Sequence, residues 1–187
     1  MRQFITVVVS LVLLYSSANV LAEYTTQWDN DFKEVYAEFF PGGDPDLLKA
    51  QALQESALNP AATSWAGAAG LMQIMPATFP EIQRMDKIVA AGTLYDPKIS
   101  IRAGAIYLRR SVNFWSSKRP WIDKYALGLA GYNAGNGNIH ESQKLCNMAV
   151  LYEGIMACLH QVTGKHAKET RGYAPGVFRY YIRLQTS

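Results

Sequence analysis

Apolar residues recur at helical spacing along most of the chain after residue 23, and no stretch shows the sustained alternation typical of strands. In the first such stretch the apolar positions are Trp28, Phe32, Val35, Tyr36, Phe39 and Phe40. Pro41 and the two glycines after it predict the end of this helix. The pattern predicts an all-α chain whose helices are separated by Gly, Pro and Asn.

A second helix is predicted over residues 45–58. Asp44 is a favourable N-cap, and Pro45 suits the first helical position, where no backbone N–H is needed. Asn59 precedes a proline and so avoids helical geometry, which predicts the end of the helix. Glu55 then lies near the C-terminal end of an apolar helix.

Glu55 shares one face of that helix with Leu48 and Ala52. We expect its carboxylate to be partly desolvated and to feel the negative end of the helix dipole. Both effects raise the pKa of a carboxyl group, as a general acid working at neutral pH requires.

Five further helices are predicted, over residues 76–85, 97–110, 121–130, 145–160 and 173–184. The glycines and asparagines of residues 131–138 predict the end of the third of these, and Gly154 is a candidate interruption of the fourth. Small residues around Trp65 predict a loop over residues 61–70. With no repeat or linker, these elements predict a single domain.

Residues 1–22 have the pattern of a secretory signal peptide. Arg2 gives a positive start, residues 4–15 are almost wholly apolar, and a small-x-small pattern predicts cleavage after Ala22. The apolar run is shorter than the ~20 residues of a membrane span, which favours cleavage over the alternative of a retained anchor. Residues 23–187 have the size of one domain.

Charge and cysteines fit an exported protein. Loss of Arg2 with the signal peptide lowers the formal charge from +3 to +2. This net charge is too small, and the basic residues are too scattered along the chain, to indicate a nucleic-acid-binding protein. Export favours a disulfide between Cys146 and Cys158, the alternative being two buried thiols. Neither these cysteines nor His140 and His160 form a ligand motif, so no metal or organic cofactor is expected.

Four short blocks follow one another along the chain: Glu55-Ser56, GLMQIMP at residues 70–76, GYNAG at residues 131–135, and Glu169-Thr170 with Tyr173. In this order they resemble the soluble-type (family 1) lytic transglycosylases of the goose-type lysozyme superfamily. The resemblance covers about residues 44–181. It implies a lysozyme-like all-α domain, over residues 23–187, with helices around a substrate cleft.

That family cleaves the β-1,4 bond between N-acetylmuramic acid and N-acetylglucosamine in peptidoglycan without water and leaves 1,6-anhydromuramic ends. The resemblance implies that Glu55 is a single general acid and base. Ordinary glycosidases use two carboxylates, and no second acidic residue lies near Glu55 in the sequence. Asp96 is the best remote candidate, but Pro97 after it favours a helix cap.

The resemblance and side-chain chemistry together predict these substrate-binding residues: Ser56, Met72, Gln73, Tyr132, Asn133 and Tyr173. Met72 is expected on the floor of the cleft, and Tyr173 is expected to hydrogen-bond Glu55 or the acetamido group. The alternative role of Ser56 is a capping hydroxyl. Glu169 is expected to be a structural partner, for example of Arg102.

The expected partner is the glycan strand of peptidoglycan in the periplasm, with no stable membrane span after signal cleavage. Small exported enzymes of this kind open the wall locally for secretion, conjugation, pilus or phage systems, whose components are further candidate partners. Two alternatives stay open: a hydrolytic muramidase of the same fold, and a catalytically silent wall-binding assembly protein.

Overall fold

The computed structural model describes residues 24–186, so the predicted signal peptide at residues 1–22 lies outside the described residues. In chain order the helices are α2 (Asp29–Phe39), α3 (Asp46–Ser56), α4 (Phe79–Met85), α5 (Lys87–Ala90), α6 (Pro97–Phe114), α7 (Trp121–Ala134), α8 (Asn136–Leu145), α9 (Tyr152–Met156), α10 (Leu159–Thr163), the 3₁₀ turn η1 (Gly164–His166) and α11 (Ala167–Leu184). Within residues 24–186, β-pairing is limited to two isolated bridges that join Ala69 to Thr63 and to Ile74. The all-α prediction is confirmed.

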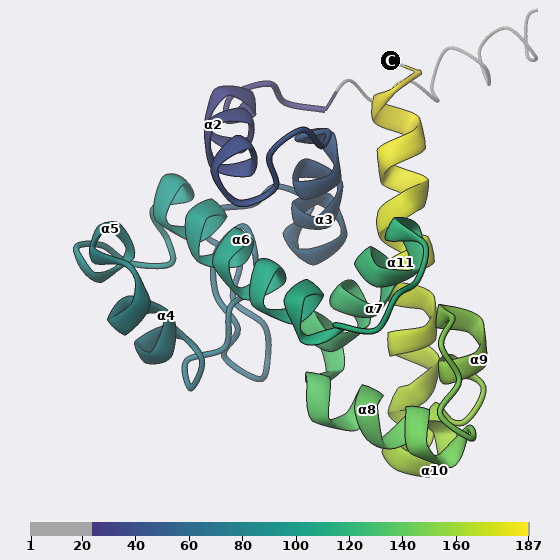
Figure 1. Ribbon diagram of the computed structural model, residues 1–187. Coiled ribbons are helices and arrows are strands. Elements are labelled where there is room, and N and C mark those ends of the chain that lie inside the picture. The colour runs from purple at the N-terminus through teal and green to yellow at the C-terminus, as the bar shows by residue number, and fades with distance from the viewer. Residues whose placement is uncertain (1–23, 187) are drawn as a thin grey trace, which may run out of the picture.

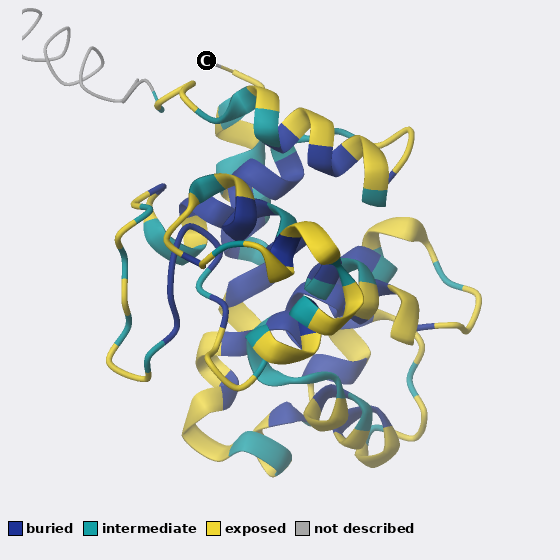
Figure 2. Cartoon of the chain, turned by 90° about the vertical axis from the view of Figure 1, so that its left-hand side faces the viewer, coloured by how far each residue is buried: buried dark blue, intermediate teal, exposed yellow. Residues whose placement is uncertain are grey.

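Helices α3, α6, α7 and α11 form the centre of the molecule (Figure 1). The most extensive contacts join α3 to α11 and α6 to α7, and α11 also packs along α7. Helices α4 and α5 lie at one side, whereas α8, α9 and α10 gather at one end of α11. Figure 2 shows buried residues on the inner helix faces and exposed residues on the outer faces.

Helix α7 extends past the point where the sequence predicts its end. It passes through Gly131 and ends at Ala134, with the N–H of Gly135 bonded to the carbonyl of Gly131. The break comes at Gly135, whose φ of 84° is a left-handed value that glycine adopts without strain. The predicted end at residue 130 is therefore wrong, and Tyr132 and Asn133 lie on the last turn of α7 rather than in a loop.

The helix predicted over residues 145–160 is also wrong. Helix α8 ends at Leu145, and Asn147 and Met148 then take positive φ values of 53° and 57°. The short helices α9 and α10 follow. A disulfide joins Cys146 to Cys158 with a Cα–Cα distance of 5.7 Å, so the predicted pairing is confirmed and links the two ends of this irregular segment.

Helix α11 begins at Ala167, six residues before the predicted start, and contains Pro175. Proline has no N–H, so the carbonyl of Arg171 loses its usual intrahelical donor. The hydroxyl of Tyr152 in α9 donates to that carbonyl instead, at 3.3 Å. This contact lets one continuous helix carry Glu169 and Tyr173.

None of the helices in residues 24–186 combines the length and the apolar character that crossing a membrane requires.

Candidate active site

A cavity of about 500 Å³ lies between the end of α3, the loop of residues 57–78, the last turn of α7 and the first half of α11. Its lining includes five of the predicted site residues: Glu55, Gln73, Tyr132, Asn133 and Tyr173. Ser56 and Met72 do not line it. The structure thus gathers residues that are up to 118 positions apart in the sequence.

A second hollow of about 400 Å³ adjoins this cavity and shares Asn133 and Glu169 with it. This second hollow reaches Thr163 and His166 at the end of α10 and in η1. The two adjoining hollows are together called the cleft.

Glu55 is the acidic side chain on the α3 wall of this cleft. Helix α3 ends at the next residue, and Ala57 and Leu58 take left-handed φ values of 52° and 61°. Burial raises the pKa of the Glu55 carboxyl from 4.5 to about 7; the hydrogen bond from Tyr173 opposes this rise, and the negative charge of Glu169 adds to it. The raised pKa expected from the sequence is confirmed, and near neutral pH this carboxyl can both give and take a proton.

The carboxyl of Glu55 is positioned by a chain of two hydrogen bonds. The Tyr173 hydroxyl donates to Oε1 of Glu55, and Nε2 of Gln51 donates to the Tyr173 oxygen at 3.2 Å. Burial, followed by the charge of Glu55, keeps the pKa of Tyr173 well above its usual value, so this phenol stays protonated. Sequence reasoning missed Gln51, although a polar side chain four residues before Glu55 in an apolar helix was the available signal.

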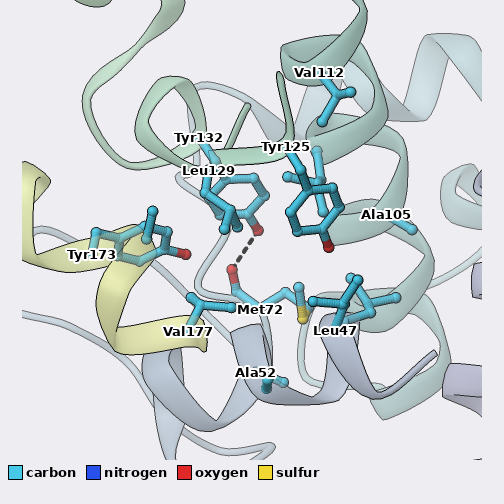
Figure 3. Packing of buried hydrophobic residues seen from close by; sticks show 14 of the residues in the cluster. Leu47, Ala52, Met72, Ala105, Val112, Tyr125, Leu129, Tyr132, Tyr173 and Val177 are labelled. Carbon is cyan, nitrogen blue, oxygen red and sulfur yellow. Dashed lines mark hydrogen bonds between the residues drawn. The ribbon is translucent and has the colours of Figure 1, made fainter. Parts of the chain in front are cut away.

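Tyr132 contributes its ring to the cleft, while its hydroxyl serves the fold. The hydroxyl donates to the backbone oxygen of Met72 at 2.7 Å, as the dashed line in Figure 3 shows. The ring makes an edge contact with Tyr107, with ring centroids 5.0 Å apart. Tyr132 therefore ties the end of α7 to the loop of residues 57–78.

Met72 does not reach the cleft. Its side chain is fully buried and packs over Gly104 of α6, where any Cβ would collide with it. Its N–H donates to Oγ of Ser100 at 3.1 Å. We therefore correct the expected contact with substrate: Met72 supports the loop from beneath.

Ser56 has a comparable structural role. Its hydroxyl lies 2.8 Å from the oxygen of Leu71 and 3.2 Å from that of Ala52. Because the hydroxyl is used on backbone, the expected contact with Glu55 or sugar is corrected to an anchor that joins α3 to the loop.

Gln73 lines the cleft from an unusual backbone position. Its φ of 46° is left-handed, a conformation that costs about 1–3 kcal/mol for such a residue unless the surroundings hold it. Nε2 donates to the carbonyls of Gly70 and Ala62 at 2.9 and 3.2 Å. Both of its donors are thus used, and only Oε1 is left to accept a hydrogen bond from a ligand.

Asn133 and Glu169 form a pair across the cleft. Nδ2 of Asn133 donates to Glu169 at 3.3 Å, and its Oδ1 accepts from the Thr170 hydroxyl at 2.8 Å. The expected link between Glu169 and Arg102 is wrong, because Arg102 instead binds Glu38 and Asp86. Glu169 is thus a second carboxylate in the cleft. The sequence did not indicate this, because Glu169 lies far from Glu55 along the chain.

Asp96 is a helix cap and not a partner of Glu55. Its carboxylate accepts from the N–H groups of Lys98 and Ile99 at the start of α6. The described residues hold no group of three or more His, Cys, Asp or Glu side chains that could bind a metal ion. Glu55 and Glu169 are the acidic side chains that line the cavity.

Trp65 is the most exposed side chain of the cleft. It is 99% exposed at the tip of the loop, yet it lines the same cavity as Glu55. Met75, which lines the same cavity, is 42% exposed, so the loop presents two exposed apolar side chains at the cavity.

A family model, curated relatives and solved structures all relate this chain to the same family. Residues 35–147, more than half of the chain, match the family described as "Transglycosylase SLT domain". The matched range contains Glu55, Gln73, Tyr132 and Asn133, while Tyr173 lies beyond it.

Two proteins named membrane-bound lytic murein transglycosylase F illustrate the similarity. The protein of Serratia proteamaculans (strain 568) is 34% identical over 117 residues, 63% of this chain and 23% of that protein. The protein of Shewanella loihica is 32% identical over 168 residues, 82% of this chain and 34% of that protein. The chain thus spans only a quarter to a third of the length of these curated relatives.

Solved structures agree with the fold. The 70 kDa soluble lytic transglycosylase of Escherichia coli matches with a TM-score of 0.67 at 26% identity, over 89% of this chain and 25% of that one. An inactive glutamate-to-glutamine mutant of lytic transglycosylase Slt from Pseudomonas aeruginosa matches with a TM-score of 0.70 at 27% identity, with the same coverage. A complex of the 70 kDa enzyme with bulgecin A has a TM-score of 0.69.

Proposed function

Because the chain belongs to the family of the transglycosylase SLT domain, we propose that it is a peptidoglycan lytic transglycosylase. It cleaves the β-1,4 bond between N-acetylmuramic acid and N-acetylglucosamine and leaves 1,6-anhydromuramic ends. The similar proteins carry the names of lytic transglycosylases, but the matched part of this chain covers only 23% to 34% of their length. The proposal therefore rests on the cleft of this chain, and above all on Glu55 with its pKa of about 7.

In the first step Glu55 acts as a general acid. Its carboxyl proton moves to the glycosidic oxygen as the bond from that oxygen to C1 of the muramoyl residue breaks. Burial keeps a substantial fraction of Glu55 protonated at neutral pH. The hydrogen bond from Tyr173 holds the carboxyl in place and stabilises the carboxylate that forms.

In the second step the same carboxylate acts as a base. It takes the proton of the muramoyl 6-hydroxyl while that oxygen bonds to C1, which closes the 1,6-anhydro ring. The proton that Glu55 lost is thereby restored and no water is consumed. The acetamido group of the substrate can stabilise C1 between the steps, so one carboxylate is sufficient.

The remaining cleft residues hold the sugar chain. Oε1 of Gln73 is an acceptor for a sugar hydroxyl or amide N–H, since its amide hydrogens are already used. The exposed indole of Trp65 offers a flat apolar face on which a sugar ring can stack, whereas Tyr132 is 8% exposed and contributes only part of the cavity wall. Asn133 lines both hollows and so stands where the polymer passes from one to the other.

Replacement of the acid tests this proposal. Glu55→Gln is expected to slow the release of soluble fragments from purified peptidoglycan by roughly a hundredfold to ten-thousandfold, because the amide cannot donate the proton. Glu34→Gln on the exposed face of α2 is the matched control and should keep full activity. Native turnover by Glu55→Gln, or no release by the parent protein, would contradict the proposal.

A hydrolytic muramidase is the second candidate, and Glu169 is the observation that favours it. A carboxylate in the same cavity as Glu55 is what a water-using mechanism would employ. Asn133 donates a hydrogen bond to one oxygen of Glu169. This contact favours a positioning role for Glu169 over the role of a base that activates water. The mass of the products separates the two mechanisms, since the anhydro product lacks one water.

We propose that the protein works in the periplasm. The disulfide between Cys146 and Cys158 fits an oxidising compartment. Local opening of the wall for a secretion, conjugation, pilus or phage system is the role proposed there. Deletion of the gene should impair assembly of one such apparatus while general growth of the wall continues.

A further inference from the structure

A separate cavity of about 600 Å³ lies away from Glu55. It forms where α2 ends and α3 begins. Its lining includes four aromatic and two charged side chains: Tyr36, Phe40, Trp121, Tyr181, Asp44 and Arg109. Hydrogen bonds from Tyr181 to Asp44 and from Gln185 to Asp46 hold the end of α11 beside it. In Figure 1 this is the end of α11 that lies next to α3.

The two cavities lie at opposite ends of the same helices. Helix α3 reaches the second cavity at Leu47 and the first at Glu55, and α7 reaches them at Trp121 and Asn133. At 1.5 Å per residue these separations correspond to about 12 and 18 Å along the helix axes. Ligands could therefore occupy both cavities at once.

Aromatic rings form a rigid wall of the second cavity. Trp121 stacks on Tyr125 with centroids 4.8 Å apart, and Phe40 stacks on Tyr36 at 4.9 Å. Trp121 is nevertheless 51% exposed. Stacking fixes the indole while leaving one face open, which is the arrangement of a binding platform.

Arg109 provides the positive charge of this cavity. Its guanidinium lies over the ring of Phe40 at 5.5 Å, and among residues 24–186 it has no carboxylate within salt-bridge distance. Its neighbour Arg110, by contrast, pairs with Glu81 at 2.9 Å. A guanidinium with only a ring for a partner is available for a carboxylate, which it binds with two parallel hydrogen bonds.

A buried hydroxyl adds a donor. Tyr36 is 1% exposed, and its hydroxyl lies beside that of Tyr125 without a partner of good hydrogen-bond geometry among residues 24–186. Burial raises the pKa of Tyr36 to about 12, so the hydroxyl keeps its proton. Buried polar groups are normally paired, so an acceptor on a ligand would complete this one.

We propose that this cavity is a second binding site, for the carboxylate-bearing stem peptides of peptidoglycan. The proposal rests on the proposed function, which places the protein on the cell wall. A ligand carboxylate binds Arg109, a carbonyl accepts from Tyr36, and the apolar body of the peptide packs on Trp121. Asp44 also lines the cavity. Its carboxylate already accepts from the Tyr181 hydroxyl and from the N–H of Asp46, and each oxygen can accept once more, from the amide or amino groups that stem peptides also carry.

The size of the cavity and the start of α7 at its edge agree with such a ligand. Its volume lies within the ~300–1,000 Å³ typical of ligand pockets. Helix α7 begins at its edge, and the positive end of its dipole favours an anion. At the start of α3 the carboxylates of Asp44 and Asp46 already take that place.

The consequence is a protein that holds two parts of the wall at once. One stem peptide is bound at Arg109 while a glycan strand lies against Glu55. Anchoring raises the local concentration of strands at the cleft, so it should lower KM for peptide-bearing wall and leave kcat unchanged.

Binding of the free stem tripeptide (alanine, glutamate and diaminopimelate) to Glu55→Gln protein tests the site directly. Nuclear magnetic resonance should show shifts at the indole N–H of Trp121. Arg109→Ala should weaken binding about tenfold or more, since a charge-assisted contact is lost, whereas Arg110→Ala is the matched control and should bind as the parent does. Shifts confined to the Glu55 cavity, equal binding by both variants, or equal binding of an unrelated acidic tripeptide would overturn the proposal.

Turnover gives the second measurement. Arg109→Ala should raise KM on intact sacculi with unchanged kcat, and should equal the parent on glycan strands from which an amidase has removed the peptides. Equal loss on both substrates, or no change on sacculi, would overturn the second site. A parent protein that cleaves neither substrate would instead disprove the proposed function, while the tripeptide titration still decides the second site.

Discussion

At the scale of single residues, the central feature is a carboxyl group whose pKa is set by burial and by two neighbouring side chains. Burial raises the pKa of Glu55 to about 7, the hydroxyl of Tyr173 lowers it, and the charge of Glu169 raises it. The sequence was sufficient to identify Glu55 and Tyr173 because both stand in short distinctive blocks. The contribution of Glu169 could not be predicted, since it depends on how α11 is placed against α3.

The pH dependence of turnover should report this arrangement. In the proposed mechanism the protonated form of Glu55 is the acid, so kcat/KM is expected to fall as pH rises through about 7. Glu169→Gln removes a charge that raises the pKa of Glu55, so the fall in kcat/KM should move to lower pH. Tyr173→Phe removes a hydrogen bond that lowers this pKa, so the fall should move to higher pH. Profiles that shift in the same direction in both variants would contradict the assignment.

The same group should make the protein less stable at high pH. Below pH 4.5 Glu55 is protonated in the folded and the unfolded chain, so its charge costs nothing. Between pH 4.5 and about 7 the folded chain keeps a proton that the unfolded chain releases, so stability falls as pH rises. Glu55→Gln should therefore be more stable than the parent at pH 8 by about 1–3 kcal/mol, an amount reduced by solvent in the cleft.

Urea unfolding at pH 4 and pH 8 measures this difference. The advantage of Glu55→Gln should be present at pH 8 and vanish at pH 4. An equal difference at both values would show that ionisation of Glu55 is not its cause.

At the scale of elements, hydroxyl groups attach the loop of residues 57–78 to the surrounding helices. Ser56, Ser100 and Tyr132 bind backbone atoms of Leu71 and Met72. The sequence assigned Ser56 and Tyr132 to the substrate because both belong to the blocks of the resemblance. Which way each hydroxyl points depends on contacts with residues 15 and 60 positions away, which local patterns do not encode.

Loss of the Tyr132 hydroxyl should act on stability rather than on binding. Tyr132→Phe leaves the carbonyl of Met72 buried without its donor, at a cost of about 1–3 kcal/mol. Tyr107→Phe, which changes the neighbouring ring, is the matched control and should have little effect. Chemical denaturation measures the difference, and a rise in KM without loss of stability would show that the hydroxyl binds substrate after all.

Helix types were predictable from apolar spacing, and several boundaries were not. Gly131 was expected to end α7, but its carbonyl stays bonded to Gly135 and it packs against Asn136. Pro175 in α11 is tolerated because Tyr152 supplies the missing donor. At Pro175 a tertiary contact overrides local propensity, whereas at Gly131 the helix simply continues through the glycine.

At the scale of the whole molecule, α3, α7 and α11 connect two cavities of different chemistry. Their ends near Glu55 form an acidic cleft, and their other ends form the aromatic cavity with Arg109. The fold and its family follow from the sequence, whereas the second cavity could not be predicted. It combines residues of α2, α6, α7 and α11 whose individual patterns indicate only core packing.

The mass of the fragments released from peptidoglycan in ¹⁸O-labelled water tests the account most directly. If Glu55 alone closes the muramoyl 6-hydroxyl onto C1, every new muramoyl end is a 1,6-anhydro end and contains no ¹⁸O. Fragments that are heavier by one water and carry ¹⁸O at C1 would contradict the account, and would assign the base to Glu169 in a hydrolytic reaction.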